Sequence, residues 1–488
     1  MSRILINILK SCPVEAIYGN AERIVSELTF DSRKVVRDAA FFAIKGTTND
    51  GHEYISKAIK LGATTIVCEQ IPDEKQTEIT YIKVTDSAQA LAIAASNYFD
   101  NPSQSLKLIG VTGTNGKTTT ATLLYKLFAS LGYACGLIST IENLIDGKHI
   151  DATHTTPDPI QLNALLAQMV AKGCSYAFME VSSHAIDQQR IAGLSFVGGV
   201  FTNLTHDHLD YHKTFAVYRD TKKRFFDLLP DTAFALVNSD DKNGNFMLQN
   251  TAAKKYTYAL KTNADFKGKI IESSFDGLIL EINNKELHSA MIGRFNAYNL
   301  LAVYGTALLL KADSEEVMLA LSSLQEPVGR FNVYRSDSGV IAIVDYAHTP
   351  DALQNVLQTI NAIRTHNEQL ITVVGAGGER DKLKRPEMAR IAGELSTKVI
   401  LTSDNPRNED PDEIIAQMRV GIQPHHYNRV VAITNRKEAI RTAILVAQQG
   451  DIILVAGKGH ETYQEIKGKK YDFDDMKVLL EMFNASDE

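Results

Sequence analysis

Short apolar runs alternate with segments of helical spacing along most of the chain. The runs at 106–111, 175–179 and 197–202 have the length of buried strands, and a segment with the spacing of a helix, 121–128, follows the first of them. Alternation of this kind is typical of a mostly parallel sheet with helices on both faces. The pattern therefore predicts an α/β fold.

Two interruptions divide the chain into three regions. The sequence Asn-Pro-Ser at 101–103 breaks the pattern, and a new series of apolar runs begins at 339–344. We expect a small α/β domain at 1–104, a central domain with a mostly parallel sheet at 105–334, and a Rossmann-like domain at 335–488. A chain of 488 residues has the length of about three domains.

The composition of the chain restricts the kinds of molecule that it can bind. The net formal charge is -7, so the chain lacks the overall basic field of a nucleic-acid-binding or membrane-surface protein. Its four cysteines have neither metal nor redox spacing and are typical of reduced thiols. No apolar run is long enough to cross a bilayer. We expect a cytoplasmic protein that neither binds nucleic acid nor inserts into a membrane, and we expect it to be a monomer.

A glycine-rich loop at 110–120 joins a predicted strand to a predicted helix. Its sequence is Gly-Val-Thr-Gly-Thr-Asn-Gly-Lys-Thr-Thr-Thr. In such loops the backbone N–H groups and the helix N-terminus bind phosphate. Lys117 can reach the outer phosphates, and the Thr118 hydroxyl can bind Mg²⁺. The common pattern has glycine five residues before the Gly-Lys pair, where this chain has Val111. We still predict a nucleoside triphosphate site, because an ordinary turn rarely combines these residues.

Polar residues also follow two other predicted strands of the central region. Glu180 ends the run at 175–179, and the loop at 206–212 contains three histidines and two aspartates. Because ligands bind at the carboxyl ends of parallel strands, we expect Glu180 to contact a nucleotide-bound Mg²⁺. Zinc is conceivable at 206–212, but it normally has a more complete set of His and Cys ligands. We therefore favour one imidazole near Mg²⁺ and phosphate.

Several motifs together resemble those of the Mur ligases of peptidoglycan synthesis. They lie at 110–119, 179–184, 202–212, 293–299, 344–350, 404–407 and 457–461, and the resemblance extends through all three regions. The last two motifs, Asp-Asn-Pro-Arg and Gly-Lys-Gly-His-Glu, narrow the resemblance to the members that add meso-diaminopimelate as the third residue of the peptide.

This resemblance implies ATP-dependent amide formation with ATP and two Mg²⁺ ions. ATP phosphorylates the D-glutamyl carboxylate of UDP-N-acetylmuramoyl-L-alanyl-D-glutamate. The amine of meso-diaminopimelate then attacks the acyl phosphate, and inorganic phosphate leaves. The first step is a phosphoryl transfer, which needs positioning and charge neutralisation more than covalent chemistry from the protein.

The resemblance also implies the residues that act on the nucleotide. The catalytic residues are Lys117, Glu180, His208, Lys222 and Arg330. The ATP-binding residues are Gly113, Thr114, Asn115, Gly116, Lys117, Thr118 and Thr119, with Asn296 and Asn299 near the adenine and Asp345 at the ribose. The metal ligands are Thr118, Glu180, His208 and a carbamylated lysine, which the resemblance assigns to Lys222 rather than Lys223.

The other two substrates are assigned in the same way. Ser32 and Thr47 are implied for the UDP group, and Thr155, Thr156, Ser182, Gln188 and Arg190 for the sugar-peptide end. His154 stands where the family pattern has a small amide side chain. The amino acid is assigned to Arg380, Asp404, Asn405, Arg407, Gly457 and Glu461. A bidentate Arg407 suits the far carboxylate of diaminopimelate, which lysine lacks.

Three alternatives remain at this point. The first is the same reaction with L-lysine. The second is a ligase like folylpolyglutamate synthase, which the Asp-Asn-Pro-Arg motif and Asp-Ser-Arg at 31–33 disfavour. The third is a nucleotide-binding switch, but the Asn-Lys-x-Asp motif expected of one is missing, since the Asn-Lys pair at 284–285 continues as Glu-Leu.

Overall fold

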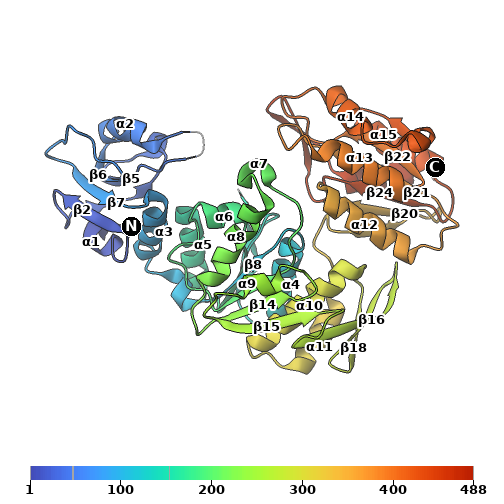
Figure 1. The fold of residues 1–488 in the computed structure, drawn as a ribbon, viewed down its shortest axis with the longest axis horizontal. Coiled ribbons are helices and arrows are strands. Elements are labelled where there is room, and N and C mark those ends of the chain that lie inside the picture. The colour runs from blue at the N-terminus through green and yellow to red at the C-terminus, as the bar shows by residue number, and fades with distance from the viewer. Residues whose placement is uncertain (1, 47–48, 153, 487–488) are drawn as a thin grey trace.

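The structure is a computed structural model that describes residues 2–46, 49–152 and 154–486. Within these ranges three bodies follow one another along the chain, each built around its own β-sheet (Figure 1). The described part of the chain is thus α/β throughout, as the alternating apolar runs predict. None of its helices has the length and apolar character needed to cross a membrane.

The N-terminal body contains a five-stranded sheet of order β2-β7-β6-β5-β4. Helix α3 covers it, because its apolar side chains Ala90, Leu91 and Ala94 pack against the strands. Helix α3 also contacts α5 of the central body. The elements are β1 (Arg3–Ile4), α1 (Leu5–Ile8), β2 (Val14–Tyr18), β3 (Ile24–Val25), β4 (Leu28–Thr29), η1 (Ser32–Lys34), β5 (Ala39–Phe42), η2 (Gly51–Tyr54), α2 (Ile55–Lys60), β6 (Ala63–Cys68), β7 (Thr80–Val84) and α3 (Ser87–Tyr98).

The central body contains an eleven-stranded sheet of order β11-β10-β9-β12-β8-β13-β14-β15-β16-β17-β18. Two apolar clusters, one on each face, cover its middle strands. The elements are η3 (Pro102–Ser105), β8 (Lys107–Thr112), α4 (Lys117–Ser130), β9 (Cys135–Ile138), β10 (Asn143–Ile145), β11 (Lys148–Ile150), α5 (Pro159–Ala171), β12 (Tyr176–Glu180), α6 (Ser183–Asp187), β13 (Gly198–Phe201), α7 (Leu209–His212), α8 (Phe215–Asp227), β14 (Phe234–Asn238), α9 (Gly244–Met247), β15 (Lys254–Ala259), β16 (Phe266–Ser274), β17 (Gly277–Ile282), β18 (Lys285–Ser289), α10 (Arg294–Leu309) and α11 (Ser314–Ser323).

Both edges of the central sheet are antiparallel, unlike its parallel middle. Strands β9, β10 and β11 form one antiparallel edge, and β16, β17 and β18 form the other. A hairpin needs only a short turn and no crossover helix, so the alternation of strands with helices does not reveal it. The Asn283–Asn284 turn has positive φ at both residues (50° and 63°), as the tight turns of hairpins require.

The C-terminal body contains a six-stranded sheet of order β19-β20-β24-β21-β22-β23, parallel except for β19. Apolar clusters again lie on both faces. The elements are β19 (Asn332–Arg335), β20 (Ile341–Asp345), α12 (Pro350–Ile363), β21 (Leu370–Ala376), α13 (Lys384–Leu395), β22 (Lys398–Ser403), α14 (Pro411–Arg419), η4 (Pro424–Arg429), β23 (Val430–Ala432), α15 (Arg436–Val446), β24 (Ile452–Ala456), β25 (Tyr463–Ile466), β26 (Lys469–Asp472) and α16 (Asp475–Ser486).

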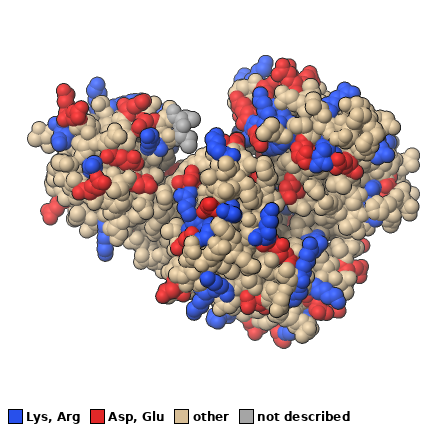
Figure 2. All heavy atoms as spheres, viewed as in Figure 1, with Lys and Arg blue, Asp and Glu red and all other residues tan. Residues whose placement is uncertain are grey.

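The register of the central strands places the polar residues at their carboxyl ends side by side. In the sheet Val111 of β8 pairs with Glu180 of β12 on one side and with Val200 of β13 on the other. The phosphate loop, Glu180 and the loop after β13 therefore leave the sheet side by side. Acidic and basic side chains are interspersed over the face of the molecule in Figure 2, so any strongly cationic site is local.

Candidate active site

The phosphate loop needs its glycines because other groups approach its backbone closely. Gly116 has a φ of 84°, and a Cβ there would lie 2.6 Å from Asn299 Oδ1. A Cβ at Gly113 would lie 1.9 Å from Thr202 Oγ1. Val111, where the common pattern has glycine, is still part of β8 and is fully buried. Because the strand continues through this position, no glycine is required there.

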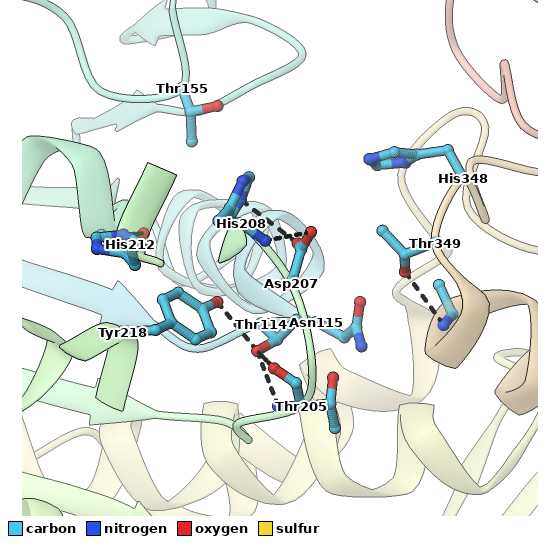
Figure 3. Close-up of polar contacts among 12 residues, drawn as sticks. Thr114, Asn115, Thr155, Thr205, Asp207, His208, His212, Tyr218, His348 and Thr349 are labelled. Carbon is cyan, nitrogen blue, oxygen red and sulfur yellow. Dashed lines mark hydrogen bonds and ion pairs between the residues drawn. The ribbon is translucent and has the colours of Figure 1, made fainter. Parts of the chain in front are cut away.

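The loop after β13 holds the phosphate loop in place. The backbone N–H of Asn115 donates to Asn203 Oδ1 at 2.9 Å, and that of Thr114 donates to Asn203 O at 2.8 Å. Thr114 Oγ1 accepts from the N–H of Thr205 at 3.0 Å and lies 3.1 Å from the hydroxyl of Tyr218 (Figure 3). The conformation of the phosphate loop is therefore fixed by contacts outside it.

Two lysines point at the same carbonyl of this loop. Lys117 Nζ donates to Gly113 O at 3.1 Å and to Thr114 O at 2.7 Å, and Lys222 Nζ donates to Gly113 O at 2.8 Å. Burial, and then the neighbouring Lys117, hold the pKa of Lys222 well below its usual value. Lys223 instead forms an ion pair with Asp227 one turn along α8. Of the two adjacent lysines, Lys222 alone reaches the phosphate loop.

Glu180 has a carboxylate oxygen that no other group satisfies. Its side chain is fully buried, and Oε1 accepts from the N–H of Thr140 at 2.7 Å. Within the described residues, Oε2 has no hydrogen-bond partner. An unpartnered buried oxygen is costly unless a cation or proton compensates it. Thr118, in the first turn of α4, is the other Mg²⁺ ligand predicted for this ion. Its hydroxyl is buried and accepts from Arg330 Nη2 at 3.3 Å.

The histidine-rich loop contributes one exposed imidazole to the site. His208 begins α7 with a φ of 54°, and its Nε2 lies 3.4 Å from Asp207 Oδ2 (Figure 3). His212 is buried and lies 3.0 Å from the hydroxyl of Ser183. Across the described ranges, no group of three or more His, Cys, Asp or Glu side chains is arranged to hold a metal. The loop therefore lacks the ligand set of a zinc site.

The predicted adenine and ribose residues form a buried group beside the loop. Asn299 Nδ2 donates to Asn296 Oδ1 at 3.0 Å, and Asn296 Nδ2 donates to Ile292 O at 2.9 Å. Asp345, at the end of β20, accepts from the N–H of Phe331 at 2.7 Å, and burial raises its pKa to about 6. Arg330 lies near Asp345, whose pKa its charge lowers in part, and its guanidinium donates to Thr118 Oγ1 at 3.3 Å.

A direct contact joins the C-terminal body to the phosphate loop. Asp351, in the first turn of α12, accepts from Asn115 Nδ2 at 2.6 Å and from Thr205 Oγ1 at 2.9 Å. His348 and Thr349 face the phosphate loop from the same side in Figure 3. The nucleotide end of the site is thus built from two bodies.

A cavity of about 1180 Å³ lies between the N-terminal and central bodies. Its lining includes the predicted residues Ser32, Gln188 and Arg190, together with His154 and Tyr211. Thr47, also predicted here, lies outside the described residues.

The remaining sugar-peptide residues connect this cavity to Glu180. Arg190 Nη1 donates to Thr156 O at 2.7 Å, and Thr156 Oγ1 donates to the carbonyl of Glu180 at 2.8 Å. Ser182 Oγ lies 3.4 Å from Thr156 Oγ1. Thr155 Oγ1 accepts from Thr140 Oγ1 at 3.0 Å. A row of polar groups therefore runs from the cavity to the backbone carbonyl of Glu180.

The predicted amino-acid residues meet at the ends of β22 and β24. Asn405 Nδ2 donates to Glu461 Oε2 at 2.7 Å, and the buried Lys458 donates to both of these side chains at 3.0 Å. Asp404 lies against Gly457, where a Cβ would stand 2.6 Å from Asp404 Oδ2 and the φ is 122°. Asn405, Glu461 and Lys458 thus form one hydrogen-bonded cluster, and Asp404 and Gly457 lie against it.

The two predicted arginines lie on neighbouring loops beside this cluster. Arg407 Nη1 donates to Gly378 O at 2.7 Å, and its Nε lies 3.4 Å from Glu465. Its backbone, with a φ of 53°, is also fixed, because its N–H donates to Glu465 O at 3.0 Å. Arg380 is exposed on the loop after β21.

Comparison with known proteins gives matches along nearly the whole chain. Three family models match: the Mur ligase family catalytic domain at 24–99, the Mur ligase middle domain at 111–307, and the Mur ligase glutamate ligase domain at 329–459. The UDP-N-acetylmuramoyl-L-alanyl-D-glutamate--2,6-diaminopimelate ligase of Phocaeicola vulgatus is 56% identical over 476 residues, which cover 98% of both chains. The chain belongs to the Mur ligase family.

Other Mur ligases agree with this assignment. The protein of the same name from Cytophaga hutchinsonii is 55% identical, covering 96% of this chain and 97% of its own. A solved structure of a UDP-N-acetylmuramoyl-L-alanyl-D-glutamate--2,6-diaminopimelate ligase is 33% identical, covers 100% of both chains and has a TM-score of 0.71. A folylpolyglutamate synthase from Thermotoga maritima shares the fold, with a TM-score of 0.59, at 15% identity over 75% of this chain.

Sequence reasoning missed several residues of this Mur ligase site. Asn203, Asp351 and Lys458 all lie within or next to motifs that were recognised, but no role was assigned to them. Their signal is position, since each follows the carboxyl end of a strand. Tyr211 of the 206–212 loop was also missed, although it lines the cavity and its hydroxyl donates to Asp187 at 2.8 Å.

Proposed function

We propose that this Mur ligase joins the amine of meso-2,6-diaminopimelate to the D-glutamyl carboxylate of UDP-N-acetylmuramoyl-L-alanyl-D-glutamate at the expense of ATP. The observation that carries the proposal is the identity of 56% to a diaminopimelate ligase over 98% of both chains. The product is the UDP-linked tripeptide of peptidoglycan synthesis. We also propose that the protein is a cytoplasmic monomer.

The three domains have separate tasks in this proposal. Residues 1–104 bind the UDP group, 105–334 bind ATP, and 335–488 bind the amino acid. The cavity between the first two bodies supports this division, because Ser32, Gln188 and Arg190 line it. The row of polar groups from Arg190 through Thr156 to Glu180 would lead the peptide end toward the phosphate loop.

The nucleotide would be held by the phosphate loop and by cations that have no carboxylate partner among the described residues. Lys117 and Arg330 would exchange their contacts with Gly113 O and Thr118 Oγ1 for phosphate oxygens. Asn296 and Asn299 would line the adenine site, and Asp345 the ribose site. Transfer of the γ-phosphoryl group to the glutamyl carboxylate then depends on alignment and charge neutralisation.

The donor set around the loop fits Mg²⁺. Mg²⁺ in phosphoryl-transfer sites is usually held by one or two carboxylates together with substrate phosphates, and Glu180 has a buried oxygen with no partner among the described residues. Thr118 and Glu180 would hold one ion, and His208 with carbamylated Lys222 a second. When bound, the ions would neutralise the charge that develops on the transferred phosphoryl group.

Lys222 is suited to carbamylation because it is buried and its pKa is strongly lowered. A neutral amine can attack CO₂, and the new N–C bond gives a carbamate once a proton is lost. The carbamate would replace a buried cation by an anion that can bind Mg²⁺. Lys223, although also buried, is turned away from the phosphate loop, because its Nζ pairs with Asp227 Oδ1.

The acyl phosphate is attacked by the amine of the amino acid, which the C-terminal cluster would hold. Arg407 and Arg380 would bind carboxylates of diaminopimelate, and Asp404 and Glu461 its far ammonium. The position of His154 in the lining of the cavity leaves it near the muropeptide rather than the amino acid.

Phosphate release tests the proposal directly. The protein should release phosphate from ATP when both the UDP-muropeptide and meso-diaminopimelate are present, and not with either alone. L-lysine and L-glutamate, tested in place of meso-diaminopimelate, represent a lysine-adding ligase and a folylpolyglutamate-synthase-like reaction. A preference for either of these, or release without an amino acid, would contradict the proposal.

A further inference from the structure

Two loops that carry proposed amino-acid residues are joined by a buried ion pair. The loop after β21 carries Arg380, and the loop after β22 carries Arg407. The pair consists of Arg385, in the first turn of α13, and Glu409, at the end of the second loop. The Arg385 side chain is 0% exposed and the Glu409 side chain 21%.

The guanidinium of Arg385 contacts both loops and a third element. Nη1 donates to Glu409 Oε2 and Nη2 to Glu409 Oε1, each at 2.9 Å, which is the bidentate geometry of a strong pair. Nη2 also donates to Gly377 O at 3.2 Å, and Nη1 to Gln417 Oε1 of α14 at 2.7 Å. One planar side chain thus links the loop after β21, the loop after β22 and helix α14.

The carboxylate of Glu409 completes the link from the other side. Its Oε1 accepts from the backbone N–H of Glu379, the residue before Arg380. The hydrogen bond from Arg385 lowers the pKa of Glu409 to about 2, so the carboxylate is ionised at neutral pH. Arg407, two residues before Glu409, donates to Gly378 O at 2.7 Å. The two loops are therefore joined at three consecutive residues of the first, 377–379.

We propose that Arg385 and Glu409 are positioning residues for the amino-acid substrate. They fix the two loops relative to each other, so that the guanidinium groups of Arg380 and Arg407 face one substrate at a set separation. The proposal rests on the function proposed above. Neither residue needs to touch the substrate, because Arg385 is fully buried and both of its terminal nitrogens are used by protein acceptors.

The expected signature is a selective change in KM. The proposed ATP and muropeptide sites use other loops, so their KM values should change little when this pair is broken. Displacement of a binding group by about 1 Å is enough to cost about 10²-fold. We therefore expect Glu409→Ala to raise the KM for meso-diaminopimelate by about 10- to 100-fold. Glu409→Gln and Arg385→Lys should give smaller increases, because each keeps part of the hydrogen bonding.

The same helix offers a matched control. Arg390 of α13 also pairs with two glutamates, Glu387 and Glu394, each at 2.6 Å, but it contacts neither loop. Arg390→Ala should leave all three KM values unchanged. The measurements are phosphate-release kinetics with each substrate varied in turn, made at a temperature where circular dichroism shows that every variant is folded.

A double variant tests whether the two residues act as one unit. Arg385→Ala with Glu409→Ala should have about the same KM for meso-diaminopimelate as the worse single variant. A change of less than about twofold in a folded Glu409→Ala, or an equal rise in all three KM values, would overturn the positioning role. If Glu409→Ala does not fold, Glu409→Gln and Arg385→Lys decide in the same way. Failure of the proposed function is a separate result, since the wild-type protein would then release no phosphate with meso-diaminopimelate.

Discussion

The phosphate-loop site and the amino-acid site both lie at the carboxyl ends of parallel strands, but they differ in how their charges are balanced. At the phosphate loop, Lys117 and Lys222 donate to carbonyl oxygens and Arg330 donates to a hydroxyl. In the described part of the chain none of the three pairs with a carboxylate. Such a site gains most from a polyanion such as ATP, which supplies the missing negative charge.

Four cations at or next to the proposed amino-acid site already have carboxylate partners. Arg385 pairs with Glu409, Arg436 with Asp475, Lys458 with Glu461 and Arg407 with Glu465. A balanced site suits a substrate that itself carries both ammonium and carboxylate groups, because such a substrate replaces one partner of a pair without leaving a buried charge alone. Under the proposed function, the two strand-end sites would therefore select a polyanion and a zwitterion through opposite balances of charge.

Removal of a cation from the unbalanced site should have the largest effect. We expect Lys117→Ala to lose about 3–4 kcal/mol of transition-state stabilisation, or about 10²- to 10³-fold in kcat. Lys222 shares the contact with Gly113 O but not the one with Thr114 O, so it does not fully replace Lys117. The measurement is phosphate release with all three substrates, with thermal unfolding as the control for folding. Turnover close to that of the wild type would contradict the assignment of the nucleotide site.

The adjacent lysines of α8 provide a matched pair for the next prediction. Lys222→Ala should be almost inactive and should regain activity when acetate is added, because a short carboxylate can replace the carbamate that we propose. Lys223→Ala removes an ion pair with Asp227 and a contact with the Phe246 ring, neither of which involves the phosphate loop, and should keep most of the activity.

Two further results would decide the position of the carbamate. Depletion of CO₂ and bicarbonate should lower the activity of the wild-type protein, and the activity of Lys222→Ala with acetate should not respond to this depletion. An active Lys222→Ala without acetate, or an inactive Lys223→Ala, would show that the carbamate is not on Lys222.

Substitution in the balanced site should change selectivity rather than abolish phosphate transfer. L-lysine lacks the far carboxylate that we propose Arg407 binds, so it loses the hydrogen bonds from the guanidinium that remain free for substrate. We therefore expect the wild-type protein to prefer meso-diaminopimelate over L-lysine by about 10³-fold, on the order of 4 kcal/mol. Arg407→Ala should raise the KM for meso-diaminopimelate far more than that for ATP and reduce this preference. The measurement is kcat/KM for both amino acids in both proteins. If the ratio of kcat/KM for the two amino acids is the same in Arg407→Ala as in the wild type, Arg407 does not determine the specificity.

Much of the fold and of the phosphate site could be predicted from the sequence because their signals are local. The phosphate loop is a continuous motif between a strand and a helix, and Glu180 directly ends an apolar run. The choice of Lys222 over Lys223 came from the family resemblance. The contact of Lys222 with Gly113 O, in place of the Asp227 pair that Lys223 makes, gives this prediction a physical basis.

The remainder depends on partners that are distant in the sequence. Asn115 and Asp351 are 236 residues apart, and Arg385 and Glu409 are 24 residues apart on different elements. No spacing rule links such residues, since their contact is created only when the sheets are formed. The antiparallel edges of the central sheet escaped prediction for a different reason, because their short strands carry no helix between them.

The smallest expected effect concerns the contact between the C-terminal body and the phosphate loop, at Asp351. This carboxylate accepts from Asn115 of the phosphate loop and from Thr205, and burial raises its pKa. We expect Asp351→Ala to raise the KM for ATP by about tenfold, since hydrogen bonds to a charged group contribute about 1.5–3 kcal/mol and part of this is recovered by water. The KM for meso-diaminopimelate should change less, because the amino-acid cluster is left intact.

Asn355→Ala is the control for Asp351→Ala. Asn355 also donates to Asp351, at 3.2 Å, but this hydrogen bond lies within α12 and does not involve the phosphate loop. Its KM for ATP should stay close to that of the wild type. Solution scattering with an ATP analogue and the muropeptide gives a second readout, because a nucleotide held by two bodies should make the protein more compact. If Asp351→Ala binds ATP and becomes compact as the wild type does, the contact serves only the folded structure and does not support nucleotide binding.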